Sequence, residues 1–283
     1  MKPSPLLRVE NAAVRRPADH GGAVRTLWYN LDLAVHPGEL IAILGPSGGG
    51  KTTLLRSILG LQKLSAGSIR FASDHHRPHD RDAIGYVPQQ RTFSADTALR
   101  ARDVVALGLH GTRYGLPVPR RGDHARVDAT LREVGAFDYG HRRVGALSGG
   151  EVQRLRVGQA VIHRPSLLLA DEPLTNLDPA HQRGIVDIID RQRRDHDTAV
   201  LVVTHDINPL LGRVDRILYL AGGRFRFGTP DDVLRSSILS DLYRSPVDVI
   251  RAHGRIIVAG TNEATAHHDE VQHPDATHHG DRS

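Results

Sequence analysis

Short apolar runs, separated by polar and turn-forming residues, set the pattern of this 283-residue chain. Residues 6–14 and 31–35 alternate apolar and polar positions, as strands with one exposed face do. Residues 40–44, 166–170 and 199–204 are almost continuously apolar, which is typical of strands buried on both faces. We therefore expect a mainly parallel sheet at the centre of the fold.

Helical patterns follow and separate these buried runs. A Gly-rich turn joins the first run to a helical segment at residues 51–59, and residues 182–194 form a helical segment between the other two. Buried strands that alternate with helices predict an α/β domain. Residues 91–146 differ, because helical segments at 102–109 and 124–134 flank a turn-rich stretch. We interpret this part as an inserted helical subdomain.

The pattern divides the chain into three parts. The main domain spans residues 6–234, and its last helix begins near residue 231 with acidic residues in the first turn. Residues 235–261 form a C-terminal extension. Residues 262–283 are polar and without periodicity, and we expect a disordered tail. The tail holds five histidines at irregular spacing, which leaves open whether it binds a metal ion: His267, His268, His273, His278 and His279.

The composition excludes several classes of protein. The 39% hydrophobic and 24% charged content is typical of a folded globular protein, and the absence of cysteine excludes disulfides, thiol catalysis and thiolate metal sites. No apolar stretch is long enough to span a bilayer, and the N-terminus does not have the pattern of a secretory signal, which favours the cytoplasm. The net charge of +5 comes from arginine, because only three of the 37 basic residues are lysines. Without a compact basic run that contains aromatic residues, we expect no nucleic-acid partner.

A phosphate-binding loop is the strongest chemical motif in the sequence. It follows a buried strand and precedes a helix, so backbone amides and the positive end of the helix point at a bound phosphate. Lys51 is then expected to reach the β- and γ-phosphates, and Thr52 to bind Mg²⁺. The alternative is a Gly-rich turn without a ligand. The predicted ATP-binding residues are Gly45, Pro46, Ser47, Gly48, Gly49, Gly50, Lys51, Thr52 and Thr53.

Two adjacent carboxylates, Asp171 and Glu172, end the second buried run. The carboxyl ends of the strands are the ligand-binding edge of an α/β sheet. Asp171 is suited to holding Mg²⁺, and Glu172 is suited to polarising an attacking water. A solvated turn or a helix start remains the alternative reading of this pair.

A third motif, Leu-Ser-Gly-Gly-Glu at residues 147–151, is followed by Gln153 and Arg154 and precedes a helical pattern. With this motif between the other two groups of residues, the chain resembles the ABC ATPase family from about residue 6 to residue 234. The resemblance implies a P-loop NTPase core of α/β class with an antiparallel β subdomain and an inserted helical subdomain. It also implies ATP and Mg²⁺ as cofactors.

The resemblance implies roles for further residues. Gln89 corresponds to the Q-loop glutamine that contacts Mg²⁺ and the γ-phosphate, and His205 corresponds to the switch histidine. Gln89, Lys51, Glu172 and His205 are thus the expected catalytic group, and Thr52, Gln89 and Asp171 the expected Mg²⁺ ligands. The family geometry further implies a homodimer with two active composite sites, each completed by four residues of the partner copy: Ser148, Gly149, Gly150 and Asp178.

One position departs from the family pattern. Where the family stacks adenine on an aromatic residue after the first strand, this chain has Arg15 or Arg16, and Trp28 and Tyr29 come later. An arginine guanidinium stacks on a base as well, so we expect nucleotide binding to be retained. The residue that contacts adenine is left open.

The sequence most resembles the separate ATPase subunits of zinc, manganese and iron-chelate importers, on residues 84–90, 102–108 and 205–211. It departs from that pattern at residues 94–100, which lack an expected proline. The resemblance implies a polytopic permease as a separate chain, an extracytoplasmic substrate-binding protein as an indirect partner, and a position at the cytoplasmic face of the cell membrane. The alternative is a nucleotide-switched regulatory or nucleic-acid-associated ABC ATPase that moves no solute.

Overall fold

A six-stranded sheet forms the centre of the computed structural model, which describes residues 4–16, 24–72, 83–89, 94, 96–110 and 121–260. Five strands are parallel, and β9 at the edge pairs antiparallel with β8. In spatial order the strands are β5 (Ile84–Val87), β6 (Leu167–Asp171), β7 (Ala199–Val203), β3 (Leu40–Leu44), β8 (Arg216–Ala221) and β9 (Arg224–Gly228).

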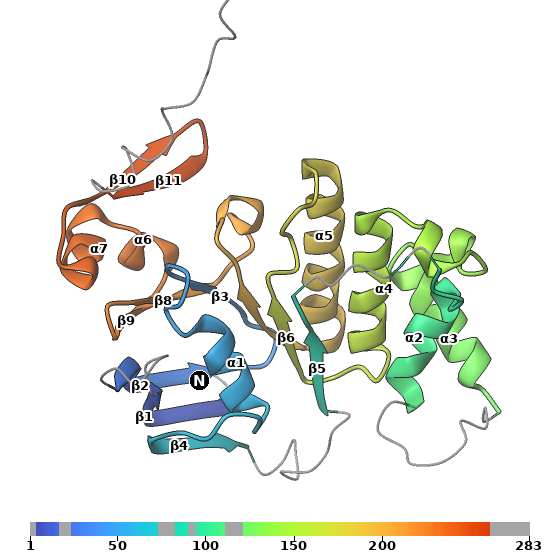
Figure 1. Cartoon of the computed structure of the whole chain (residues 1–283), viewed down its shortest axis with the longest axis horizontal. Coiled ribbons are helices and arrows are strands. Elements are labelled where there is room, and N and C mark those ends of the chain that lie inside the picture. Colours follow the sequence, from blue (N-terminus) through green and yellow to red (C-terminus); the bar gives the residue numbers. More distant parts are fainter. Residues whose placement is uncertain are drawn as a thin grey trace, which may run out of the picture.

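Strands β3, β6 and β7 are buried along their whole length, as their apolar runs predict. Because successive side chains of a strand point to opposite faces, each of these strands contributes to two cores. Leu40 and Ala42 pack with the helices of one face, whereas Ile41 and Ile43 pack with the elements of the other. The sheet is therefore the middle layer of the fold (Figure 1).

One face of the sheet is covered by α1 (Lys51–Ile58) and a three-stranded antiparallel sheet. This second sheet has the order β2-β1-β4, from β2 (Arg25–Val35), β1 (Leu7–Arg16) and β4 (Ala66–Phe71). Trp28 on β2 is fully buried in the core between the two sheets. The antiparallel sheet implied by the family resemblance is thus present.

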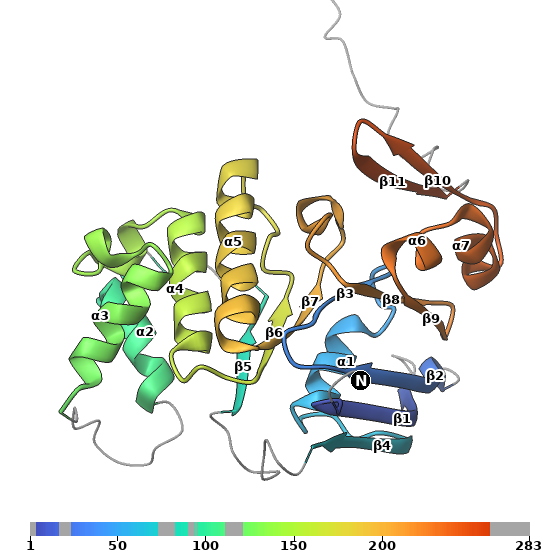
Figure 2. The same ribbon diagram turned by 180° about the vertical axis from the view of Figure 1, so that it is seen from behind.

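The opposite face of the sheet is covered by α4 (Gly149–Val161) and α5 (Pro179–His196). Helices α2 (Ala101–His110) and α3 (Asp123–Glu133) pack against α4 and lie at the end of the molecule beyond β5 (Figures 1 and 2). Short 3-10 turns at Phe137–Tyr139 and Val144–Ala146 lie between α3 and α4 in the chain. None of the helices in the described ranges is both long and apolar enough to cross a membrane.

The C-terminal part folds into two short helices and a hairpin. Helices α6 (Pro230–Val233) and α7 (Ser236–Tyr243) lead to β10 (Val247–Ala252) and β11 (Arg255–Gly260), which pair antiparallel. Figure 2 shows this hairpin at the opposite end of the molecule from α2 and α3. The predicted His-rich tail, residues 262–283, lies outside the described residues, as do residues 111–120 of the predicted helical subdomain.

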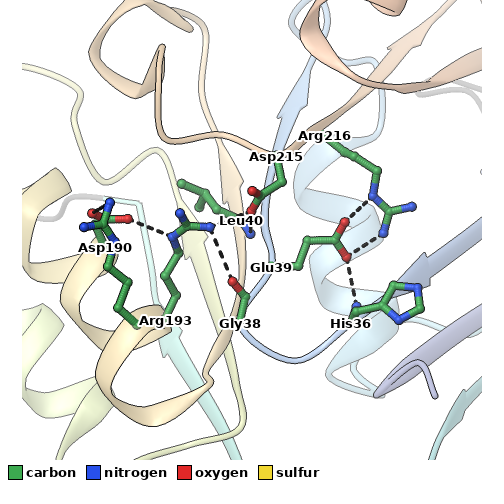
Figure 3. Close-up of polar contacts among 9 residues, drawn as sticks. His36, Gly38, Glu39, Leu40, Asp190, Arg193, Asp215 and Arg216 are labelled. Atoms are coloured by element: carbon green, nitrogen blue, oxygen red, sulfur yellow. Dashed lines mark hydrogen bonds and ion pairs between the residues drawn. The ribbon is translucent and has the colours of Figure 1, made fainter. Parts of the chain in front are cut away.

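Two groups of ion pairs hold the amino-terminal end of β3 to its neighbours (Figure 3). The Glu39 carboxylate accepts hydrogen bonds from both the Nε and an Nη of Arg216, the first residue of β8. Arg193 of α5 donates to Asp190 at 2.7 Å and to Asp215 at 2.6 Å. The Glu39 and Arg216 side chains are only 12% and 21% exposed. These charged groups therefore connect α5, β3 and β8 at the edge of the sheet opposite the P-loop.

Candidate active site

The P-loop joins the carboxyl end of β3 to the amino end of α1. Gly45 has φ +137, and a Cβ atom at this position would lie 2.0 Å from the carbonyl oxygen of Leu220. Gly50 has φ +90, and its Cβ would lie 2.8 Å from the indole ring of Trp28. Both positions therefore require glycine, because the backbone passes too close to its neighbours for any side chain. The loop therefore packs between Leu220 of β8 and the buried Trp28.

Lys51 extends back along this loop. Its Nζ donates to the carbonyl oxygens of Gly45 at 2.7 Å and Pro46 at 3.0 Å. Burial lowers the pKa of Lys51, and the carboxylates of Glu172 and Asp171 oppose that shift. An ammonium group in this position can exchange a carbonyl acceptor for a phosphate oxygen with little movement.

Thr52 and Asp171 form the predicted magnesium pair. Thr52 Oγ1 donates to Asp171 Oδ1 at 3.1 Å, and the Asp171 residue is only 2% exposed. Burial raises the pKa of Asp171, whereas the hydrogen bond from Thr52 lowers it. A buried carboxylate beside a hydroxyl is the kind of oxygen donor set that Mg²⁺ prefers. The residues present therefore fit that ion.

Glu172 is the point at which three separate segments meet. Its Oε1 lies 2.5 Å from Nε2 of His205, and its Oε2 accepts from Gln89 Nε2 at 3.2 Å and from Thr175 Oγ1 at 3.3 Å. The Glu172 backbone has φ 51, a left-handed conformation that few non-glycine residues adopt, and its N–H donates to Val203 O. The structure thus brings three of the four predicted catalytic residues together, because His205 and Gln89 both contact Glu172.

A cavity of about 270 Å³ lies between these groups and the P-loop. Of the predicted site residues, Ser47 to Thr53, Gln89, Glu172 and His205 line it. Gly45 and Pro46 line a neighbouring cavity instead, and Asp171 contacts the lining residue Thr52. Among the described residues that line the cavity there is none from the Leu-Ser-Gly-Gly-Glu motif or the Asp178 loop. The four residues Ser148, Gly149, Gly150 and Asp178 therefore lie outside this cavity; Ser148, Gly149 and Asp178 are exposed, and Gly150 is buried.

The motif residues begin α4. Ser148 Oγ accepts from the Glu151 N–H at 3.3 Å, and Glu151 Oε2 accepts from the Ser148 N–H at 2.8 Å, which is a capping box. A Cβ atom added to Gly149 would have no neighbour within 4 Å, whereas a Cβ on Gly150 would lie 2.1 Å from the His181 ring. His181 therefore packs directly on the motif.

Asp178 caps the next helix, α5. Its Oδ1 accepts from the N–H groups of Ala180 at 2.9 Å and His181 at 3.0 Å, and its Oδ2 lies 2.5 Å from His181 Nδ1. These hydrogen bonds, with that from the His181 backbone largest, lower the pKa of Asp178. The link that His181 makes between Asp178 and Gly150 was not predicted, because only the packing of α4 on α5 brings them together.

The candidates for adenine contact occupy different environments. Arg16 and Leu27 line the cavity, whereas Trp28 is buried beneath Gly50, with its indole N–H 3.4 Å from the Gly50 carbonyl. Tyr29 is 44% exposed, and neither Tyr29 nor Arg15 lines this cavity. The contact with adenine stays a prediction, for which Arg16 is the better placed arginine.

Comparison with known proteins shows sequence similarity to ATP-binding transport proteins. Residues 28–175 match the ABC transporter family. The manganese transport system ATP-binding protein MntB of Bacillus subtilis is 33% identical over 76% of this chain and 85% of its own length. The zinc import ATP-binding protein ZnuC of Pseudomonas fluorescens is 33% identical over 84% of this chain and 82% of its own.

A solved structure extends the similarity to the fold. An inward-facing metal-chelate type ABC transporter contains a chain with a TM-score of 0.74 and 25% identity, over 90% of this chain and 96% of that one. The sequence, the fold and the contacts around Glu172 therefore all indicate the same family. The chain belongs to the ABC transporter family, as one of its ATP-binding and ATP-hydrolysing subunits.

Proposed function

We propose that this chain is the ATPase subunit of an importer for zinc, manganese or an iron chelate, and that it drives a separate permease. The observation that carries the ATPase part is the contact of Glu172 with both His205 and Gln89 beside the P-loop. The cargo class is supported by the names of relatives at about one-third identity, which are manganese and zinc transport proteins.

The proposed hydrolysis uses the residues around the 270 Å³ cavity. Lys51 and the P-loop amides bind the β- and γ-phosphates. Glu172 accepts a hydrogen bond from the attacking water and thereby polarises it. His205 lines the same cavity and would contact the γ-phosphate. Gln89 donates to the Glu172 carboxylate, and in this proposal it couples the nucleotide state to the helical subdomain.

Mg²⁺ would be held beside this cavity by Thr52 and Gln89, which line it, and by Asp171, which accepts a hydrogen bond from Thr52. When bound, it would neutralise charge on the β- and γ-phosphate oxygens. Its proposed ligands Thr52, Gln89 and Asp171 lie on α1, after β5 and at the end of β6. The 3.1 Å hydrogen bond between Thr52 and Asp171 keeps those two oxygens together before the ion arrives.

We further propose that two copies close on two nucleotides. In one copy the Ser148 to Gly150 motif does not contribute to the cavity, yet it presents the amide groups of the first helical turn at the start of α4. A second copy can supply those groups, together with Asp178, to the open side of the site. Because both copies are the same chain, the two active sites of the proposed homodimer would be equivalent.

The membrane partner in this proposal is a polytopic permease at the cytoplasmic face of the cell membrane. In this proposal the permease docks beside Gln89 and the helices α2 and α3. An extracytoplasmic binding protein would act through the permease and need not touch this chain.

Purification of the chain with its membrane partners in mild detergent tests the proposal. We expect a polytopic permease to co-purify, and the ATPase rate of that complex to respond to one of Zn²⁺, Mn²⁺ or an iron chelate. A complex without a permease, or an ATPase stimulated by DNA or RNA in a salt-dependent manner, would favour the regulatory alternative instead.

A further inference from the structure

The loop that follows His205 is tied to the C-terminal hairpin through one side chain. Asn208 Oδ1 accepts from the backbone N–H of Ile256 at 2.8 Å, and Asn208 Nδ2 donates to the carbonyl of the same residue at 3.0 Å. The amide therefore pairs with β11 as a neighbouring strand would. Asn208 and Ile256 are 48 residues apart in sequence, so this contact joins the extension to the ATPase core.

Asp206 fixes the orientation of the Asn208 amide. Its Oδ1 accepts from the Asn208 backbone N–H at 2.9 Å and from Asn208 Nδ2 at 2.6 Å. A carboxylate accepts but does not donate, so the NH₂ group must face it, and Oδ1 of Asn208 then faces the Ile256 N–H. Ile207 and Ile256 are only 5% and 7% exposed, so the two segments that Asn208 connects have little freedom to move.

The hairpin also borders the active site through a cavity of about 850 Å³. One wall of this cavity is formed by Pro46 and Ser47 of the P-loop and by His205, and the other by Ile256 and Val258 of β11. Asn208 lies in the same lining. The cavity thus lies between the hairpin and the catalytic loops, and Asn208 connects the two sides.

We propose that Asn208 is a positioning residue for hydrolysis, which makes the hairpin Val247–Gly260 part of the catalytic apparatus. The inference rests on the proposed role of His205. Asp206 follows His205 directly, and His205 Nε2 lies 2.5 Å from Glu172 Oε1. The continuous series from Ile256 through Asn208 and Asp206 to His205 holds the imidazole at the catalytic carboxylate. Release of this connection lets His205 leave Glu172 without disturbing the P-loop.

A matched control exists on the other strand of the hairpin. Ser240 of α7 makes the same kind of two-point contact with Val247: its Oγ accepts from the Val247 N–H at 2.9 Å and donates to the Val247 carbonyl at 3.2 Å. Ser240→Ala therefore removes two hydrogen bonds from the hairpin without touching the His205 loop. A role limited to holding the hairpin would make the Asn208 and Ser240 variants equivalent.

The test compares kcat and KM for MgATP in the full chain with Asn208→Ala, Asn208→Asp and Ser240→Ala. Asn208→Asp keeps the size of the side chain and places a carboxylate against the Ile256 carbonyl. We expect kcat to fall about three- to tenfold in both Asn208 variants with KM within about twofold of wild type, and Ser240→Ala to hydrolyse ATP at the wild-type rate. Equal rates in all four proteins would overturn the inference.

A double variant separates this inference from the proposed role of His205. In a His205→Ala background, Asn208→Ala should cause no further loss of kcat, because both changes act on the same group. Multiplicative losses would mean that Asn208 acts elsewhere, and the inference would be wrong. If His205→Ala alone leaves kcat unchanged, the proposed catalytic role of His205 fails, and the inference fails with it.

Discussion

His205 Nε2 lies 2.5 Å from Oε1 of Glu172, although the two residues are separated by 33 positions that include the whole of α5. They meet because β6 and β7 are parallel neighbours whose carboxyl ends lie at the same edge of the sheet. Glu172 follows the last residue of β6, and His205 follows β7 after one residue. The contact between them is thus a consequence of strand order.

The partly buried ion pair between Glu39 and Arg216 predicts a large loss of stability on removal of one partner. Arg216→Met leaves the Glu39 carboxylate without its guanidinium, which should lower the free energy of unfolding by about 3 kcal/mol. Arg70→Met is the control, because Arg70 and its partner Glu10 are 71% and 41% exposed, and it should cost less than about 1 kcal/mol. Urea unfolding of the two variants gives both values, and similar losses would contradict the argument.

The contact of His181 with Gly150 predicts a steric effect within one chain. Gly150→Ala places a methyl group 2.1 Å from the imidazole, and we expect an overpacking cost of about 1–3 kcal/mol. Gly149→Ala has open space and should keep or raise stability, because alanine favours a helix. Thermal unfolding distinguishes the two. Adding His181→Ala to Gly150→Ala should restore the melting temperature, and no recovery would show that the strain lies elsewhere.

Asp171 predicts a pH dependence of stability in the absence of nucleotide. Burial raises its pKa above 3.8, so the folded chain holds this proton more tightly than the unfolded chain. The stabilisation of the folded chain that comes from binding the Asp171 proton is complete at low pH, and it is lost as the pH rises through the pKa of Asp171 in the folded chain. Asp171→Asn should therefore melt at a higher temperature than wild type at pH 8, and the difference should shrink toward about pH 4.

Differential scanning calorimetry across this pH range checks the expectation. Asp248→Asn, on the exposed face of β10, controls for the loss of one negative charge. A wild-type chain that is the more stable of the two at pH 8 would show that Asp171 is stabilised in its ionised form, contrary to the effect of burial.

The central sheet was largely predictable because its buried strands are continuous apolar runs. Strands β3, β6 and β7, and helices α1 and α5, follow the expected segments closely. The hairpin of the extension was not predicted, although a signal was present. His253 and Gly254 both have positive φ, at 51 and 73, and this X-Gly pair forms the two-residue turn that joins β10 to β11.

The site was predictable only in part from local sequence. The P-loop is contiguous, so its glycines and Lys51 could be assigned from spacing. Gln89 and His205 could be assigned only through the family resemblance, because their contact with Glu172 depends on the order β5-β6-β7 in the sheet. Asn208 and His181 had no signal in the sequence, since their partners are brought close by packing between elements.

The rate of ATP hydrolysis by Glu172→Gln tests the account most directly. The substitution keeps the size of the side chain and a hydrogen-bonding oxygen for Gln89, but removes the carboxylate that faces His205. We expect hydrolysis to fall by about 100-fold or more, and the variant to accumulate as an ATP-bound dimer in gel filtration with nucleotide binding retained. Hydrolysis at the wild-type rate would contradict the assignment of Glu172 as the catalytic carboxylate.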